Sequence, residues 1–251
     1  MRVFIGKLSV RQFLALVCFF LPAFIYAQSS VQSAVMQNYT FSYSIVEAET
    51  ESVEFFELAR NEILSKAPLN GGIIYALWMP AEKSADAPFA GLSVNQMGLM
   101  LAWPNDALQQ VDALNQALQS IDSVATVSTR LFEAIYLPAG LSVPTMGGFY
   151  VHREAKYKLE DVDEAVRLSI EAWETWEPHW GVTVIGLFRE LGITADFANL
   201  NRIVWYPSYD AWRATRNNDD VESANRFRQR RGLRIPDSDS GIAIATDRIL
   251  P

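Results

Sequence analysis

The second half of this chain repeats the pattern of its first half. Residues 97–104 and residues 200–207 each form a mainly apolar stretch that closes with an aromatic residue and a proline, and a helix-prone stretch follows each. Residues 128–131 and 246–249 are also similar to each other. Each copy of an internal repeat is one structural unit whose apolar face needs a neighbour to cover it. The sequence therefore predicts two similar units packed against each other.

Hydrophobic periodicity predicts the same order of elements in both halves. Apolar residues at every second position predict strands, and apolar residues three and four apart predict helices. The first half is expected to hold a strand at 39–46, a helix at 51–66, strands at 73–79 and 97–103, a helix at 106–120 and a strand at 124–137. The second half is expected to hold a strand at 149–156, a helix at 161–177, strands at 182–189 and 202–206, a helical segment at 209–231 broken near 217–218, and a strand at 242–249. This β-α-β-β-α-β order is the ferredoxin-like arrangement, so we expect an α+β fold of two tandem ferredoxin-like units.

The strand at 97–103 carries apolar side chains on both of its faces, with Leu99 and Leu101 on one and Met100 and Ala102 on the other. Successive residues of a strand point to opposite faces of the sheet, so both faces must be covered. The helices of a ferredoxin-like unit cover only one. The simplest cover for the second face is the sheet of the sister unit. This predicts a barrel-like interior within one chain, which can enclose a ligand where packing is incomplete.

The N-terminus has the pattern of a secretory signal peptide. Basic residues precede an apolar run at 13–25, and a small residue, Ala27, stands at the expected cleavage position. The run is short for a membrane span, which needs about 20 apolar residues. We therefore expect cleavage after Ala27, a periplasmic or secreted mature protein and no stable membrane anchor. The only cysteine, Cys18, lies in this run, so a disulfide or a thiolate nucleophile is not expected in the mature chain.

Composition changes along the chain predict five segments. Residues 1–27 form the signal peptide, and the Ser- and Gln-rich residues 28–38 form a flexible segment. The first ferredoxin-like unit spans 39–137 and the second spans 147–251. Between them, 138–146 is a linker, because proline and glycine mark a boundary there.

Charge and motif content exclude several functions. The net charge of -8 argues against nucleic-acid binding, because a nucleic-acid footprint needs a basic face. The chain holds two histidines, His152 and His179, and neither belongs to a ligand set with metal-binding spacing. It also lacks a Gly-rich phosphate loop, a Gly-x-Ser-x-Gly elbow and a His-Glu-x-x-His motif. We therefore expect no metal and no cofactor.

The second half resembles the NIPSNAP family of the dimeric α+β barrel superfamily. The similarity rests on Gly-Phe-Tyr-Val-His-Arg at 148–153, Val-Ile-Gly-Leu-Phe at 184–188 and the strand-to-helix passage at 201–209, Asn-Arg-Ile-Val-Trp-Tyr-Pro-Ser-Tyr. It covers about 147–250, and the first half matches in architecture only. The resemblance implies an intrachain dimeric α+β barrel and brings no agreed catalytic motif. The superfamily includes cofactor-independent monooxygenases, small isomerases and haem-binding enzymes, so the resemblance leaves open whether the protein is an enzyme.

General acid-base catalysis in this chain is expected to use one of its two histidines. His152 is next to Arg153 in a strand, and strand neighbours point to opposite faces. If Arg153 faces the helices or solvent, His152 faces the interior, where it could act as a general base. The plainer interpretation is a hydrogen-bonded structural histidine. For His179, at a helix end between two tryptophans, a capping role is favoured.

A second group of residues suggests ligand contact near the third strand of the second unit. Aromatic rings beside a guanidinium can hold a small anionic aromatic or acyl compound. The alternative is that these side chains are core and helix-surface neighbours. The candidate ligand-binding residues are Tyr150, Trp205, Tyr206, Tyr209, Trp212 and Arg216.

Three functions follow as hypotheses. The first is non-catalytic binding of a small apolar or amphipathic molecule in the barrel interior. The second is a cofactor-independent monooxygenase or isomerase, with His152 as the base and Arg153 or Arg202 steadying an enolate-like oxygen. The third is an interaction module that uses the polar insertion at 81–95. Because one chain holds both units, we expect a monomer or a weak homodimer.

Overall fold

The computed structural model describes residues 38–50, 53–68, 71–80, 91–141, 147–193, 195–238 and 243–247. The expected signal peptide, all but one residue of the segment 28–38, and most of the linker lie outside these ranges. So does most of the insertion at 81–95 that the interaction hypothesis uses. In the part that is described, no helix has both the length and the apolar character needed to cross a membrane.

The elements follow the predicted order in both halves. The first unit contains β1 (Tyr39–Ala48), α2 (Val53–Lys66), β2 (Ile73–Pro80), β3 (Gln96–Pro104), the short 3-10 turn η2 (Asn105–Ala107), α3 (Gln110–Gln119) and β4 (Val124–Tyr136). The second unit contains β5 (Phe149–Lys158), η3 (Leu159–Asp161), α4 (Val162–Trp180), β6 (Thr183–Glu190), β7 (Phe197–Tyr206), α5 (Tyr209–Ala214), η4 (Thr215–Asn217), α6 (Val221–Gly232) and β8 (Ala243–Asp247). The prediction of an α+β fold with ferredoxin-like units is confirmed.

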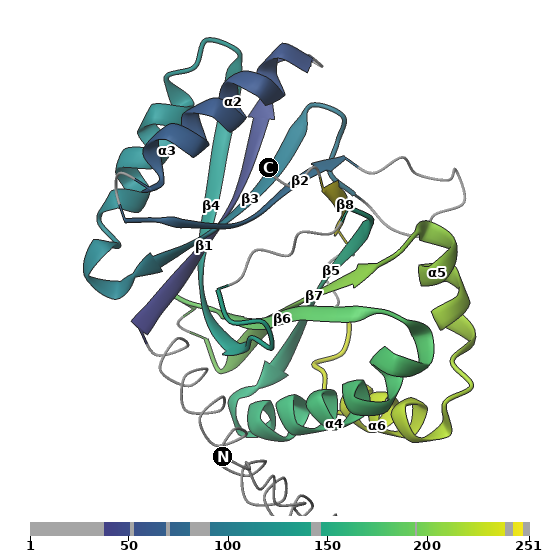
Figure 1. Ribbon diagram of the computed structural model, residues 1–251. Coiled ribbons are helices and arrows are strands. Elements are labelled where there is room, and N and C mark those ends of the chain that lie inside the picture. The colour runs from purple at the N-terminus through teal and green to yellow at the C-terminus, as the bar shows by residue number, and fades with distance from the viewer. Residues whose placement is uncertain are drawn as a thin grey trace, which may run out of the picture.

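The strands form a closed antiparallel barrel in the order β1-β3-β2-β8-β5-β7-β6-β4. Within the first unit the order is β4-β1-β3-β2, and the second unit repeats it as β8-β5-β7-β6. Two seams join the units, β2 with β8 and β4 with β6. Each seam pairs an outer strand of one sheet with an outer strand of the other, as Figure 1 shows. Closure leaves neither sheet with a free edge among these strands, so each unit completes the hydrogen bonding of the other.

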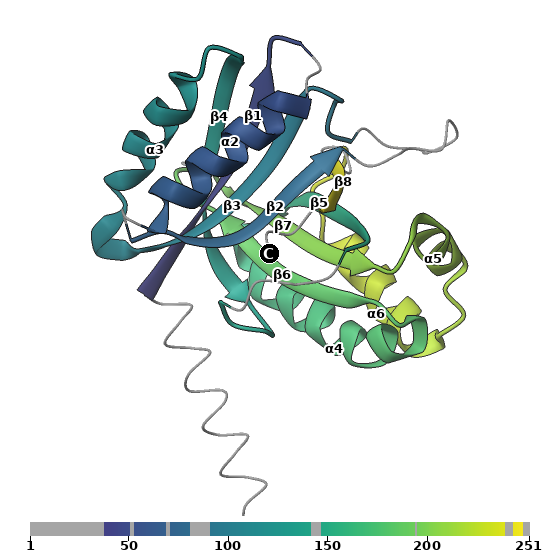
Figure 2. The same ribbon diagram turned by 45° about the horizontal axis from the view of Figure 1, so that its top comes forward.

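Alternation along the strands separates three apolar cores. One lies between the first sheet and helices α2 and α3, and another lies between the second sheet and helices α4 to α6. The third fills the barrel interior with inward-facing side chains from both sheets, among them Phe41, Tyr75, Phe132 and Phe188. The helices therefore cover the outside of the barrel, on two sides (Figure 2). Each sheet is therefore covered on both faces, by helices on one and by the sister sheet on the other, as its strand pattern predicts.

One helix end differs from the prediction. The helix expected to stop before Pro178 continues to Trp180. Gly181 ends it, because it adopts the left-handed conformation with φ 60° that closes a helix at little steric cost. A proline this near the C-terminal end interrupts the backbone ladder without stopping the last turn. The break expected near 217–218 is present, and Asp220 accepts hydrogen bonds from the backbone N–H groups that begin α6.

Candidate functional site

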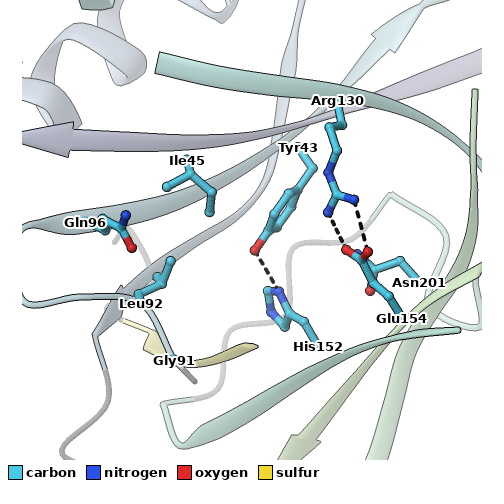
Figure 3. Close-up of a pocket in the computed structure, with 9 residues that line it drawn as sticks. All are labelled: Tyr43, Ile45, Gly91, Leu92, Gln96, Arg130, His152, Glu154 and Asn201. Carbon is cyan, nitrogen blue, oxygen red and sulfur yellow. Dashed lines mark hydrogen bonds and ion pairs between the residues drawn. The ribbon is translucent and has the colours of Figure 1, made fainter. Parts of the chain in front are cut away.

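The barrel interior contains a cavity of about 240 Å³. It lies where β1 approaches its end and β3 begins, and strands of both units contribute to its wall (Figure 3). One part of the wall is apolar and another is polar. The lining residues are Tyr43, Ile45, Gly91, Leu92, Gln96, Arg130, His152, Glu154 and Asn201. The volume is below the range of about 300–1,000 Å³ typical of sites for drug-sized ligands, so the cavity suits a small molecule and not a large planar cofactor.

A hydrogen bond between Tyr43 and His152 forms the centre of the polar wall. The Tyr43 hydroxyl oxygen lies 2.9 Å from Nδ1 of His152, and both side chains are buried. Burial raises the pKa of Tyr43 well above its usual value, so the phenol keeps its proton. Nδ1 is the one hydrogen-bond partner of that hydroxyl in the described chain, so we assign the hydroxyl as donor and Nδ1 as acceptor. The remaining imidazole proton then lies on Nε2.

The imidazole of His152 is neutral at physiological pH. Burial lowers its pKa to about 3, because the charged form would lose its hydration. Glu154 acts in the opposite direction and Arg130 adds to the lowering, but burial is the largest effect. The ring also packs edge-on against Trp78, with 4.4 Å between ring centroids. His152 therefore offers a hydrogen bond, and protonating it would be costly.

Arg130 crosses from the first unit to carboxylates of the second unit. Its guanidinium makes a two-pronged ion pair with Glu154 and a further contact of 3.3 Å to Glu190 (Figure 3 draws the Glu154 pair). The amide of Asn199 donates to both carboxylates, at 3.2 Å and 2.7 Å. Burial acts to lower the pKa of Arg130, but the bond and charge of Glu154 and Glu190 outweigh it, and the pKa rises. The positive charge of Arg130 is thus already paired with the carboxylates of Glu154 and Glu190.

Four buried polar atoms around this site have no hydrogen-bond partner among the described residues. Two are donors, Nε2–H of His152 and Nε1–H of Trp78, and two are acceptors, Oδ1 of Asn199 and Oδ1 of Asn201. Buried polar groups are almost always satisfied, because an unmade hydrogen bond costs roughly 1–3 kcal/mol. His152 and Asn201 both line the cavity. A guest or ordered water that both donates and accepts would satisfy them.

The described ranges contain no group of three or more His, Cys, Asp or Glu side chains arranged to hold a metal ion. Around the cavity, the residues of these types are His152 and Glu154, and Glu154 is paired with Arg130. One neutral imidazole is a poor metal site by ligand count. What the arrangement offers chemically is hydrogen bonding beside an apolar wall.

No protein-family model matches the sequence, and no curated protein matches it. Solved structures do match in fold. A candidate monooxygenase from Lactobacillus acidophilus superposes with a TM-score of 0.52 at 9% identity, over 84% of this chain and 93% of its own. An anthrone oxidase-like protein gives 0.52 at 11% identity, over 84% and 92%. A candidate chlorite dismutase gives 0.50 at 13% identity, over 84% and 94%.

These likenesses establish the fold and nothing finer, because fold and function are separable at such identities. The matched share of this chain is too large for one unit, so the likeness extends over both ferredoxin-like units. The NIPSNAP resemblance of the second half stays a prediction.

The predicted partner of His152 needs correction. His152 lies in the cavity wall, but Arg153 and Arg202 belong to the opposite face of the second sheet. Val151 and Ala155, which share a face with Arg153, pack in the core under the helices. Arg153 and Arg202 are cross-strand partners in the β5–β7 register. Because strand neighbours alternate in direction, neither arginine can steady an oxygen of a molecule held beside His152.

The predicted aromatic group divides between the two faces of the same sheet. Tyr150 and Trp205 face the barrel interior, although neither lines the cavity. Tyr206 and Trp212 are buried in the core between the sheet and the helices, where Tyr209 stacks on Trp212 at 5.5 Å and Arg216 lies over Trp212 at 5.0 Å. The structure does not assemble these residues into one ligand wall, because β7 separates them.

His179 is exposed on α4, and its Nε2 lies 2.8 Å from a carboxylate oxygen of Asp219. The contact ties the end of α4 to the segment before α6. This contact is made to a side-chain carboxylate and not to a backbone carbonyl of the helix end, so the capping role favoured for His179 stays a prediction.

Of the residues that line the cavity, sequence reasoning named only His152; among those it missed are Tyr43, Arg130, Glu154 and Asn201. One signal was present for Glu154, because a residue two positions after His152 shares its face of the strand. Alternation along the strand puts Tyr43 on the same face as Phe41, but nothing local shows that His152 meets it from 109 residues away. Arg130 and Asn201 carried no signal, because only closure of the barrel brings their strands together.

Proposed function

We propose that this protein binds a small, neutral, amphipathic molecule in the barrel interior. The observation that carries the proposal is that two residues lining one cavity, His152 and Asn201, each have a buried side-chain atom without a hydrogen-bond partner in the described chain, Nε2–H and Oδ1 respectively. A hydroxyl group can accept from the first and donate to the second. The apolar wall, which includes Ile45 and Leu92, suits the remainder of such a molecule.

The charges favour an uncharged guest over an anion. Arg130 is the cation of the cavity wall, and it is already paired with Glu154 and Glu190. His152 is neutral. An anionic guest would therefore meet no free positive charge among the residues that line the cavity in the described chain, and it would have to give up its hydration.

We also propose that the protein is a single-chain relative of the dimeric α+β barrels and that its second unit is of the NIPSNAP type. The repeated strand order and the two equivalent seams support this assignment. Since one chain supplies both sheets, we propose a monomer or a weak homodimer. The N-terminal pattern of basic, apolar and small residues supports export to the periplasm or beyond.

Native mass spectrometry of the mature protein, purified from the exported fraction of its host, tests the binding proposal. We expect a bound small molecule that is released on denaturation and identified by its mass. Ile45→Trp should abolish the bound species by filling the cavity, and Ile170→Trp, on the outer core, is the matched control. A protein that is ligand-free throughout, together with a water-free and fully packed interior in a crystal structure, would overturn the proposal.

A cofactor-independent monooxygenase or isomerase is the second candidate. The position of His152 in the cavity wall supports it, and so does the likeness in fold to a candidate monooxygenase and to an anthrone oxidase-like protein. The geometry favours His152 as a hydrogen-bond donor over a general base, because Tyr43 directs the imidazole proton to Nε2 and burial opposes the imidazolium. A donor at this position could stabilise negative charge that develops on a substrate oxygen.

Oxygen uptake with anthrone as the probe tests this second candidate. Turnover by the wild type that falls about 100-fold or more in His152→Ala would support a role of His152 in stabilising the transition state. Unchanged turnover in His152→Ala would exclude this role of His152. His179→Ala is the matched control, because it removes the exposed histidine.

A further inference from the structure

A second set of buried polar atoms without a hydrogen-bond partner in the described chain lies on the other face of the second sheet, under its helices. It comprises Nε of Arg202 on β7, Nε of Arg230 on α6 and Nε1 of Trp173 on α4. The set around the barrel cavity mixes donors and acceptors, whereas these three atoms are all donors. A partner for them must therefore be an acceptor.

Positive charge is concentrated at the same place. Arg202 is the cross-strand partner of Arg153, so two guanidinium groups leave the sheet side by side. Arg230 reaches them from α6 with only 6% of its surface exposed, and its Nη1 donates to Ser169 Oγ at 3.0 Å. Arg234 follows on the same side, with Nε 3.4 Å from the Tyr157 hydroxyl.

This cluster is electrostatically unfavourable by itself. Burial lowers the pKa of Arg202 well below its usual value, and the neighbouring charges of Arg230, Arg153 and Arg234 lower it further. Burial likewise lowers the pKa of Arg230 to about 10, with Arg234 and Arg153 adding to the effect. Arg153 and Arg234 have further contacts of their own. Arg202 and Arg230, in contrast, make no ion pair with a carboxylate of the described chain.

Arg202 is less enclosed than Arg230. Its Nε atom is fully buried, but the residue as a whole is only partly buried. Arginine forks match the spacing of two oxygens of a phosphate, sulfate or carboxylate group. Burial strengthens such a contact because water screens it less.

We propose that the second unit binds a small oxyanion, or the phosphate, sulfate or carboxylate group of a larger ligand, between strands β5 and β7 and helix α6, with Arg202 and Arg230 as the principal donors. This site goes beyond the proposed function, because it lies on the opposite face of the sheet from the cavity. Its ligand differs in charge from the neutral guest proposed there.

Isothermal titration of the full mature chain tests the site, with sodium phosphate, sulfate and acetate as separate probes in Tris chloride buffer at constant ionic strength. We expect saturable one-site binding of at least one probe, and the preferred probe separates a phosphate- or sulfate-type ligand from a carboxylate. Arg202→Met should weaken that binding about tenfold or more, because it removes a charge-assisted hydrogen-bond donor. Absence of saturable binding by all three probes would overturn the proposal.

Arg228→Met is the matched control, because Arg228 is exposed on α6 and bonds Asn225. It carries the same charge change and should leave the dissociation constant within about twofold of the wild type. Thermal melting without added oxyanion gives a second measurement. Arg202→Met should then raise Tm, because it relieves repulsion among the arginines. Equal binding by Arg202→Met and wild type, or a lower Tm of Arg202→Met in chloride buffer, would also contradict the proposal.

Discussion

The hydroxyl of Tyr43 donates to Nδ1 of His152 across 2.9 Å, and this bond joins β1 of the first unit to β5 of the second. It fixes which nitrogen of the imidazole carries the proton. It also leaves that proton directed away from Tyr43, at an atom that lacks a partner in the described chain. The chemistry offered to the cavity therefore depends on a contact between the two repeats.

Tyr43→Phe should destabilise the fold by about 1–3 kcal/mol, because Nδ1 of a buried imidazole loses its donor. Urea denaturation measures this change. Tyr43→Phe should also allow His152 to populate both neutral tautomers. The nitrogen chemical shifts of the imidazole, measured by NMR, report this change. Tyr75→Phe is the matched control, because Tyr75 is another buried interior tyrosine whose hydroxyl donates to the Ile185 carbonyl at 3.0 Å. A fixed Nε2–H tautomer in Tyr43→Phe would contradict the assigned role of Tyr43.

His152 should make the fold less stable in acid. Its pKa is about 3 in the folded state and 6.5 as the reference value, so between these pH values the unfolded chain binds a proton that the native chain does not. Its contribution to stability is present above pH 6.5 and is lost as the pH falls toward 3, by at most about 1.4 kcal/mol per pH unit.

The difference between wild type and His152→Gln across this pH range isolates that effect, because glutamine can still accept from Tyr43 and does not titrate. His179→Gln is the control for loss of a histidine. Parallel pH profiles of the free energy of unfolding for wild type and His152→Gln would show that His152 is not held neutral.

Arg130→Met should destabilise the barrel by about 2–3 kcal/mol, because it leaves the carboxylates of Glu154 and Glu190 without their cation. The matched control is Arg167→Met, which removes an arginine that also contacts two glutamates but on the exposed surface of α4. That change should cost at most about 1 kcal/mol. Urea is the suitable denaturant, because a denaturing salt would screen both contacts. Equal losses in the two variants would show that the interior network adds nothing.

Gly148→Ala should be strongly destabilising, by about 2 kcal/mol or more. Gly148 has φ 144°, a conformation that residues with a side chain rarely adopt. An added Cβ would also lie 2.5 Å from Nε1 of Trp205, the atom that bonds the Gly147 carbonyl. Gly232→Ala is the control, because nothing lies within 4 Å of the added Cβ there. Thermal melting of both variants checks the prediction, and similar Tm values would refute it.

The sequence determined the repeat, the order of strands and helices, and the two-sided coverage of each sheet. These features depend on local periodicity, which residues close in sequence impose on their own conformation. It also placed His152 and Arg153 on opposite faces of one strand, for the same reason. The prediction that the helix ends before Pro178 was wrong. Gly181, in the left-handed conformation, ends that helix, and the missing N–H of Pro178 does not.

Which inward-facing side chains meet depends on the folded barrel and not on local sequence. Closure of the barrel brought Tyr43 to His152 and Arg130 to Glu154, and the β5–β7 register paired Arg153 with Arg202 on the face under the helices. These relationships depend on which strands become neighbours and in what register, which is set by packing between distant segments. Burial then lowered the pKa of His152, an effect that belongs to the whole barrel and to no stretch of sequence.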